Sequence, residues 1–468
     1  MTVLDGLPAY PLILVCALAC PSVGDRPPSS DTAPTLTLQR GTLINPGTAP
    51  IPNASIVVQA GRITCAGTVS ACPPPAGSKL VDATGIYVGP GLVDAHVHYS
   101  QTGWVDGRPD AINLRAQYPY DSVVRALASH PEHFHRAYLC SGVTSVFDVG
   151  GSPWTLDIAG KSEDANDAPR VIATGQLLAT IKVPPDMMGT FVFMQDEPTV
   201  RAAVRSHRAS GADAIKVWYI QVPDSLRRHA KAMLMAAGDE TRKAGLRLVV
   251  HATEPSSARD AVAAGAFALV HEVEAPVSAE LLAALKRAGT IVIPTLTVYS
   301  GYADVFLART PATRYPLDCV DPATRKKLET KLSDSLTSGG KAFWNSPEAA
   351  RLTTNTARNL QLMHAAGIPI AMGTDAGNPG TAHGPSVFAE MEAMQQAGMA
   401  ASAVFASSTI VGARALGLEN EIGSVEAGKR ADLVGFGADP TADARNARQV
   451  RFVVRNGVLR TREQLLPH

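Results

Sequence analysis

Short apolar segments that end in a histidine or an aspartate recur along the middle of the chain. Segments rich in β-branched residues close on His98, His251, His271 and Asp375, and amphipathic stretches separate most of them. Strands that alternate with helices in this way predict an α/β fold with a parallel sheet. Because the carboxyl ends of such strands lie on one face, we expect these side chains to meet there.

Eight segments fit short parallel strands: 92–97, 144–149, 170–174, 212–219, 246–251, 266–271, 290–295 and 368–374. Helical periodicity fills the spaces between them, for example at 123–140, 226–244 and 280–288. This alternation predicts a (β/α)8 TIM barrel over residues 92–422. A doubly wound open sheet is the alternative, but no Gly-x-Gly-x-x-Gly follows the first strand.

The two ends of the chain share a different pattern of short apolar runs and turns. Residues 35–91 and 423–466 both show it, and Asn456-Gly457 is a hairpin signal. Neither segment is large enough to bury a sheet face alone. We therefore expect one small β-sandwich domain assembled from both ends.

The first 34 residues predict export. An apolar run at 12–19 ends in Ala17-Leu18-Ala19-Cys20, which suits a signal peptide over residues 1–20 with a lipid anchor at Cys20. Against this, Met1 to Pro11 contains no Lys or Arg, so a disordered leader is the alternative. Residues 21–34 are rich in Pro, Ser and Asp and predict a disordered linker. The expected location is periplasmic, extracellular or lipid-anchored.

Charge and cysteine content narrow the classes of protein further. Lys plus Arg equals Asp plus Glu at 42 each, and no basic run is present, so no nucleic-acid partner is expected. Cys65 and Cys72 flank a turn and could bridge two short strands in an exported protein. Cys140 is interpreted as a small buried hydrophobic residue.

The sequence His96-Val97-His98 places two imidazoles on one face of a strand, because side chains at i and i+2 point the same way. A lone histidine at a strand end is more often a hydrogen-bonded core residue. Four histidines and Asp375 at the carboxyl ends of predicted strands favour a divalent metal site instead.

Lys216 interrupts an apolar strand, Ala212 to Trp218. A buried lysine is costly unless it is paired or neutralised. One interpretation is a salt bridge to a neighbouring aspartate. The other is that desolvation lowers the pKa of the amine, which then takes up carbon dioxide and forms a carbamate suited to bridging two cations.

Further motifs accompany these residues in order from about residue 35 to 460: GPGLVDAHVH, SGVTSVFDVGG, GADAIKV, LVVHATE, ALVHEVE, MGTDAG, HGPSVFAEMEAMQQAGM and ALGLENEIGSVEAGKRADLVGF. On these motifs the chain resembles the amidohydrolase superfamily. Within it, the chain is similar to the imidazolonepropionase-like and Xaa-Pro dipeptidase (prolidase)-like branch that carries a carboxylated lysine.

The resemblance implies two divalent metal ions, in this family usually zinc. His96, His98 and Asp375 would bind the first, His251 and His271 the second, and the Lys216 carbamate would bridge them. Departures from the family pattern lie elsewhere: Phe147 replaces a common arginine before Asp148, and HEVE at 271–274 replaces a more usual ending. These departures leave the implied metal ligands unchanged, but they do not allow a specific substrate to be assigned.

The implied reaction is hydrolysis of an amide or peptide-like C–N bond, in a dipeptide or N-acyl amino acid, by a hydroxide held between the metals. Asp375 is the expected catalytic acid–base, and Tyr219 and His383 are candidate substrate-binding residues. The alternatives are a lactone, carbamate or organophosphate hydrolase on the same centre, and a non-catalytic scaffold. Barrels of this class often associate into homo-oligomers, but the sequence specifies neither the oligomeric state nor the side chain that the pocket selects.

Overall fold

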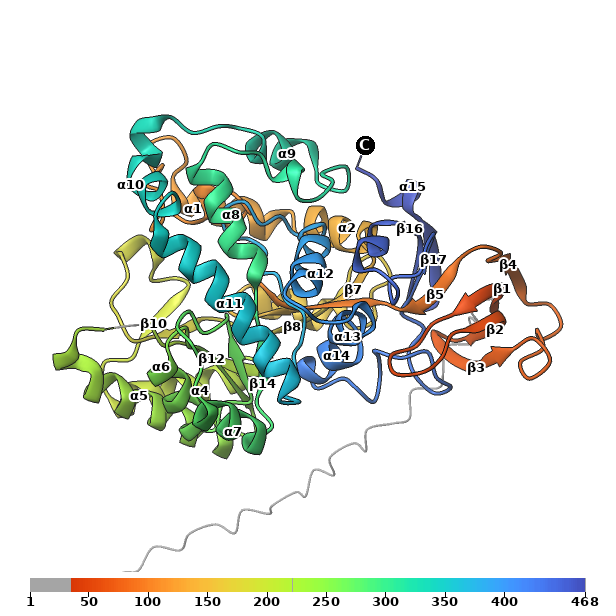
Figure 1. Cartoon of the computed structure of the whole chain (residues 1–468), viewed down its shortest axis with the longest axis horizontal. Coiled ribbons are helices and arrows are strands. Elements are labelled where there is room, and N and C mark those ends of the chain that lie inside the picture. The colour runs from red at the N-terminus through yellow and green to blue at the C-terminus, as the bar shows by residue number, and fades with distance from the viewer. Residues whose placement is uncertain (1–34, 221, 468) are drawn as a thin grey trace, which may run out of the picture.

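The computed structural model describes residues 35–220 and 222–467. The predicted leader, its Cys20 anchor and the predicted linker lie outside the described residues. The described chain forms a sheet built from both chain ends and a larger α/β unit (Figure 1). Within these two ranges, no helix is both long enough and apolar enough to cross a membrane.

One eight-stranded sheet joins the two ends of the chain, as predicted. Its strands are β1 (Leu36–Leu43), β2 (Ile51–Gln59), β3 (Arg62–Thr68), β4 (Lys79–Asp82), β5 (Tyr87–Pro90), β15 (Leu433–Phe436), β16 (Val450–Arg455) and β17 (Val458–Thr461). The antiparallel pairing of β5 with β15 connects the N-terminal strands to the C-terminal ones. Asn456 and Gly457 both have positive φ between β16 and β17, which confirms the predicted hairpin.

Two parallel sheets form the larger unit. The first contains β6 (Leu92–Val97), β7 (Val143–Asp148) and β8 (Arg170–Ala173), and the second contains β9 (Leu177–Ala179), β10 (Phe191–Phe193), β11 (Ala214–Trp218), β12 (Arg247–His251), β13 (Ala268–Val270) and β14 (Ile291–Ile293). Their ladders are all parallel, as the alternation of strands and helices predicts. The short strands β9 and β10 were not expected from the sequence.

Backbone hydrogen bonds connect the two parallel sheets on both sides. On one side, residues 369–376 lie between β14 and β6, where Val292 N donates to Pro369 O and Ala95 N donates to Met372 O. On the other side, Asp213 N donates to Ala173 O. The predicted eighth strand thus takes the expected place, but it pairs only through isolated bridges and is not a regular strand.

Most of the helices pack around the parallel strands, whereas the last one packs against β16 and β17 of the mixed sheet (Figure 1). They are α1 (Tyr120–Ser129), α2 (Glu132–Cys140), α3 (Thr155–Ser162), α4 (Glu197–Ala209), α5 (Asp224–Lys243), α6 (Pro255–Ala263), α7 (Ala279–Ala288), α8 (Leu296–Phe306), α9 (Pro322–Leu328), α10 (Asp334–Trp344), α11 (Pro347–Ala365), α12 (Ser386–Gln396), α13 (Ala401–Ser407), α14 (Ile410–Leu416) and α15 (Arg462–Leu465). The single helix predicted over 123–140 is wrong: Pro131 separates α1 from α2, because proline cannot donate the helical backbone bond.

Two disulfides link described residues. Cys65 pairs with Cys72, as predicted, but the bridge joins β3 to the turn after it and not two strands. Cys140 pairs with Cys319, 179 residues further along the chain. The interpretation of Cys140 as an unpaired hydrophobic residue is therefore corrected. Nothing in the spacing of six cysteines identifies so distant a partner.

Candidate metal centre and active site

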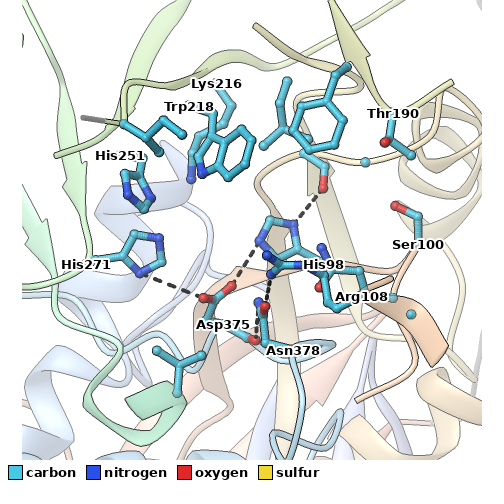
Figure 2. A pocket seen from close by; sticks show the side chains of 18 of the residues that line it. His98, Ser100, Arg108, Thr190, Lys216, Trp218, His251, His271, Asp375 and Asn378 are labelled. Atoms are coloured by element: carbon cyan, nitrogen blue, oxygen red, sulfur yellow. Dashed lines mark hydrogen bonds and ion pairs between the residues drawn. The ribbon is translucent and has the colours of Figure 1, made fainter. Parts of the chain in front are cut away.

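A cavity of about 260 Å³ opens where the parallel strands end. Five of the six predicted ligands line it: His98, Lys216, His251, His271 and Asp375 (Figure 2). The sixth, His96, is fully buried behind them. The expectation that these side chains meet at one end of the strands is therefore met in the structure.

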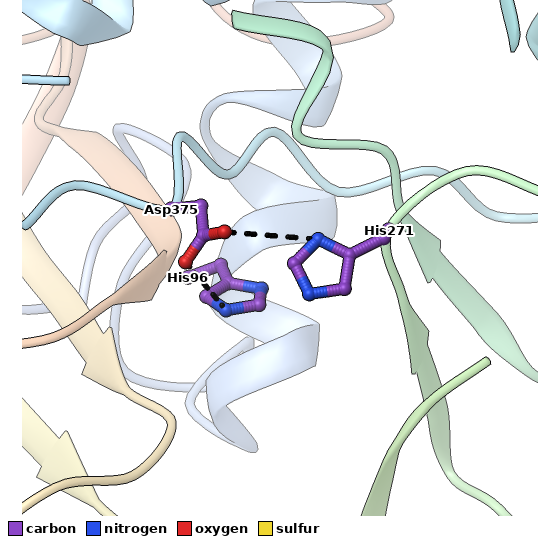
Figure 3. A group of neighbouring side chains, drawn as sticks. All are labelled: His96, His271 and Asp375. Atoms are coloured by element: carbon purple, nitrogen blue, oxygen red, sulfur yellow. Dashed lines mark ion pairs between the residues drawn. The ribbon is translucent and has the colours of Figure 1, made fainter. Parts of the chain in front are cut away.

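Four of the six side chains approach one another closely. Asp375 Oδ1 lies 3.2 Å from His96 Nε2 and 3.0 Å from His98 Nε2, and the two Nε2 atoms are 3.2 Å apart. His271 Nδ1 lies 3.8 Å from Asp375 Oδ2. His96, His271 and Asp375 each offer a ligand atom within 4.8 Å of the others (Figure 3). The ring centroids of His251 and His271 are 4.4 Å apart, which extends the cluster toward Lys216 (Figure 2).

Neighbouring groups fix the orientation of two of these imidazoles. His98 Nδ1 donates to Gly150 O at 2.6 Å, which turns Nε2 toward Asp375. The Asp148 carboxylate accepts from Gly150 N at 3.2 Å and so holds that acceptor in place. His271 Nδ1 lies within hydrogen-bonding distance of Thr295 Oγ1, at 2.8 Å.

Three non-glycine residues at the carboxyl ends of the strands adopt left-handed backbone conformations. The φ angles are +69° at His271, +51° at Thr295 and +60° at Asp375. Such conformations cost of order 1–3 kcal/mol each and persist only where the surroundings enforce them. These strained residues lie together beside the cavity, where the fold holds their side chains in fixed positions.

Burial sets the charge of the cluster. It lowers the pKa of His96 and of His251 to about 3 and that of His271 well below its usual value, so these imidazoles are neutral at pH 7. Burial also lowers the pKa of Lys216 to about 7. For Asp375, burial acts to raise the pKa, but the adjacent His96, His98 and His271 bring it well below its usual range.

This donor set fits divalent metal ions. Neutral imidazole nitrogens and an ionised carboxylate are the forms that coordinate such ions. In addition, Asp375 Oδ1, which faces His96 Nε2 and His98 Nε2, is buried and has no hydrogen-bond partner among the described residues. A cation between these ligand atoms would offset the cost of burying the Asp375 carboxylate.

The rim of the cavity contains residues that the sequence did not reveal. Arg108 lies in the loop after β6 and donates to Asp110 Oδ2 at 2.7 Å and to Asn378 Oδ1. Tyr302, on α8, also donates to Asn378 Oδ1, at 3.0 Å. Trp218 faces the cavity beside Lys216 (Figure 2). Only Trp218 had a readable signal, because it lies two positions from Lys216 on the same face of β11.

The two predicted substrate-binding residues lie outside the cavity lining. Tyr219 alternates to the opposite face from Lys216, and its hydroxyl donates to Asp260 Oδ2 at 3.1 Å. His383 is buried, with Nδ1 2.7 Å from the Tyr138 hydroxyl and Nε2 2.9 Å from Gln101 O. The arrangement gives no support for substrate contact by either residue.

Parallel strands with imidazoles and a carboxylate converging at their carboxyl ends define a hydrolase with a candidate metal site. The model of the amidohydrolase family matches residues 87–460. The chain belongs to the amidohydrolase family, which confirms the resemblance and the predicted enzyme class, a hydrolase acting on carbon–nitrogen bonds.

The chain is 28% identical over 413 residues to an imidazolonepropionase of Maricaulis maris, covering 82% of this chain and 87% of the relative. It is 26% identical over 413 residues to the imidazolonepropionase of Mesorhizobium japonicum, covering 82% and 86%. Among solved structures, a Xaa-Pro dipeptidase with bound methionine matches with a TM-score of 0.68 and 22% identity, covering 91% of this chain and 100% of that chain. That last likeness supports the fold.

Proposed function

We propose that the chain is a two-metal amidohydrolase that cleaves the amide or peptide-like bond of a small substrate bearing a carboxylate, a dipeptide or an N-acyl amino acid. The observation that carries the proposal is the meeting of four imidazoles, Lys216 and Asp375 at one cavity. In this proposal, the two connected parallel sheets form a single (β/α)8 barrel and the mixed sheet is the core of a β-sandwich domain.

In the proposed centre, His96, His98 and Asp375 would hold one ion, His251 and His271 would hold the other, and Lys216, as a carbamate, would contribute to both sites. Zinc suits this mixture of nitrogen and oxygen ligands. Divalent ions at such a site make water acidic enough to attack at neutral pH and polarise the carbonyl group.

Asp375 performs the proton transfer. Its Oδ2 is the oxygen further from His96 and His98, and the carboxylate faces the cavity. It accepts a proton from the attacking water and passes it to the leaving nitrogen, which departs as an amine. Because the nitrogen is protonated as the C–N bond breaks, it leaves as a neutral amine and not as a high-energy anion.

Arg108 anchors the substrate carboxylate. The side chain is 19% exposed and lines the cavity opposite His251 and His271 (Figure 2). Its bonds to Asp110 and Asn378 leave one N–H on each terminal nitrogen, which matches the two oxygens of a carboxylate.

Arg108→Met is expected to raise KM for a carboxylate substrate by about 10- to 100-fold, which corresponds to a charged hydrogen bond of about 1.5–3 kcal/mol. The control is the same substrate with its carboxylate converted to a carboxamide, for which wild type and variant should differ little. Equal losses on both substrates would mean that Arg108 supports the loop rather than the substrate.

Removal of divalent ions with a chelator is expected to abolish turnover, and zinc with bicarbonate to restore it. Initial rates on panels of dipeptides, N-acyl amino acids, lactones and phosphotriesters test the substrate class. Turnover of lactones or phosphotriesters alone would favour the alternative hydrolase and contradict the amide proposal. Less than one metal per chain after loading would favour the non-catalytic scaffold.

We also propose that the protein is exported. The disulfides Cys65–Cys72 and Cys140–Cys319 support this proposal, since disulfides persist in oxidising compartments and are rare in the cytosol. An amide hydrolase in that location would act on small molecules outside the cytoplasm.

A further inference from the structure

The loop formed by residues 375–382 carries Asp375 into the cavity together with Asn378. It is not held by a regular strand ladder. Asp375, Gly377 and Gly380 all have positive φ, at +60°, +108° and +74°. A loop bent in this way needs contacts from outside to keep Asp375 in one position.

A tyrosine from the segment between α8 and α9 supplies two of these contacts. Tyr315 is fully buried, and its hydroxyl donates to Gly380 O at 2.7 Å and accepts from Ala382 N at 3.0 Å. A single side-chain hydroxyl therefore bridges a carbonyl and an amide two residues apart, at the far end of the loop from Asp375.

Arg314 also binds Gly380 and connects this part of the loop to α8. Its Nη2 donates to Gly380 O at 2.6 Å, and its Nε and Nη1 donate to Asp304 Oδ2 at 2.6 Å and to Thr297 Oγ1 at 2.7 Å. Helix α8 also carries Tyr302, whose hydroxyl bonds with Asn378 in the same loop. The loop is thus held at Asn378, Gly380 and Ala382 by residues 297–315.

The Cys140–Cys319 disulfide links the segment that carries Tyr315 covalently to the end of α2. Cys319 lies four residues after Tyr315, and Cys140 is the last residue of α2, directly before β7. Tyr315, Leu317 and Ala382 belong to one small buried apolar cluster, whereas Cys140 and Cys319 belong to the main core of the α/β unit. The disulfide therefore ties the segment that carries Tyr315 to the main core.

We propose that Tyr315, supported by Arg314 and by the Cys140–Cys319 disulfide, is a positioning residue that sets the place of Asp375 in the reaction. The inference rests on the proposed function, because its effect is read through proton transfer by Asp375. Tyr315 acts through the loop and does not touch the substrate.

Tyr315→Phe is expected to lower kcat by about 10- to 100-fold, as a small displacement of a reacting group does, with KM changed by less than about threefold. The matched control is Thr290→Val, which removes a buried hydroxyl that donates to Ala266 O at the opposite ends of the strands. Thr290→Val should lower Tm and leave kcat unchanged. Equal kcat for Tyr315→Phe and wild type, or equal kcat losses in both variants, would overturn the proposal.

The disulfide gives a second test on the full-length enzyme loaded with zinc. Cys140→Ser/Cys319→Ser should lower kcat, whereas Cys65→Ser/Cys72→Ser, which removes the disulfide between β3 and the turn after it, should not. Equal kcat in both double variants contradicts the role of the Cys140–Cys319 link. If Asp375→Asn keeps full turnover, the proposed function itself fails, whatever Tyr315→Phe does.

Discussion

Asp375→Asn is expected to lower kcat by about 10²- to 10⁴-fold, the range that a positioned acid–base group contributes. Asparagine keeps the shape of aspartate and one acceptor oxygen, but it cannot take a proton from water and return it to the leaving nitrogen. The neighbouring His96 and His98 keep their other contacts, including the bond from His98 to Gly150 O. The loss should therefore appear in kcat with little change in secondary structure, measured by initial rates and circular dichroism.

Asp432→Asn is a matched control for this substitution. Asp432 is a buried carboxylate in the mixed sheet, 3.2 Å from Arg455 Nη1, and it does not line the cavity. Breaking this buried pair should lower the free energy of unfolding by about 3 kcal/mol and leave kcat near that of wild type. Near-normal turnover of Asp375→Asn would refute the assigned role. A kcat loss in Asp432→Asn as large as in Asp375→Asn would mean that both report on general destabilisation.

The metal-site residues could be predicted from the sequence because their positions follow from strand geometry. His96 and His98 alternate onto one face of β6, and His251 and His271 come at or just after the ends of β12 and β13. The same rule places Trp218, and not Tyr219, on the face of Lys216, and Trp218 does line the cavity.

The rim of the cavity depends on contacts between residues far apart in the chain. Arg108 meets Asn378 across 270 residues, and Tyr315 meets Gly380 across 65. Periodicity gives no sign of such contacts, because loops follow neither the helical nor the strand repeat. The pairing of Cys140 with Cys319 was hidden for the same reason.

The segment before residue 375 shows that an apolar sequence pattern does not always produce a regular strand. The sequence predicted a strand at 368–374 from its apolar residues, and the segment does lie between β14 and β6. It pairs with them only through isolated bridges and forms no ladder, however, and Asp375 follows with φ of +60°. A left-handed aspartate depends on contacts from elsewhere in the fold, such as the bond from Asp375 N to His96 O at 2.8 Å, which the local sequence does not reveal.

The second large effect on metal binding and turnover is expected from substitution of Lys216. It is 1% exposed in the middle of β11, and no described residue forms an ion pair or a hydrogen bond with its amine. A bare ammonium in such a place is costly. In the proposed centre, carbon dioxide would remove this cost: the amine nitrogen would form a bond to the carbon, one N–H proton would pass to water, and the product would be a carbamate anion. Such an anion would supply two oxygen ligands for the cations beside the imidazole cluster.

Lys216→Met is therefore expected to bind fewer than two metals per chain and to lower kcat by about 10³-fold, equivalent to losing several kcal/mol of charge stabilisation. In wild type loaded with zinc and ¹³C-bicarbonate, a carbamate resonance should appear in the carbon NMR spectrum and be absent from Lys216→Met. The control is Lys327→Met, since Lys327 forms an ion pair with Asp106 at 2.7 Å and does not line the cavity. It should retain the resonance, the metals and the turnover.

A resonance that persists in Lys216→Met, or two tightly bound metals in that variant, would show that the amine is not the bridge. The centre would then be held by the imidazoles and Asp375 alone.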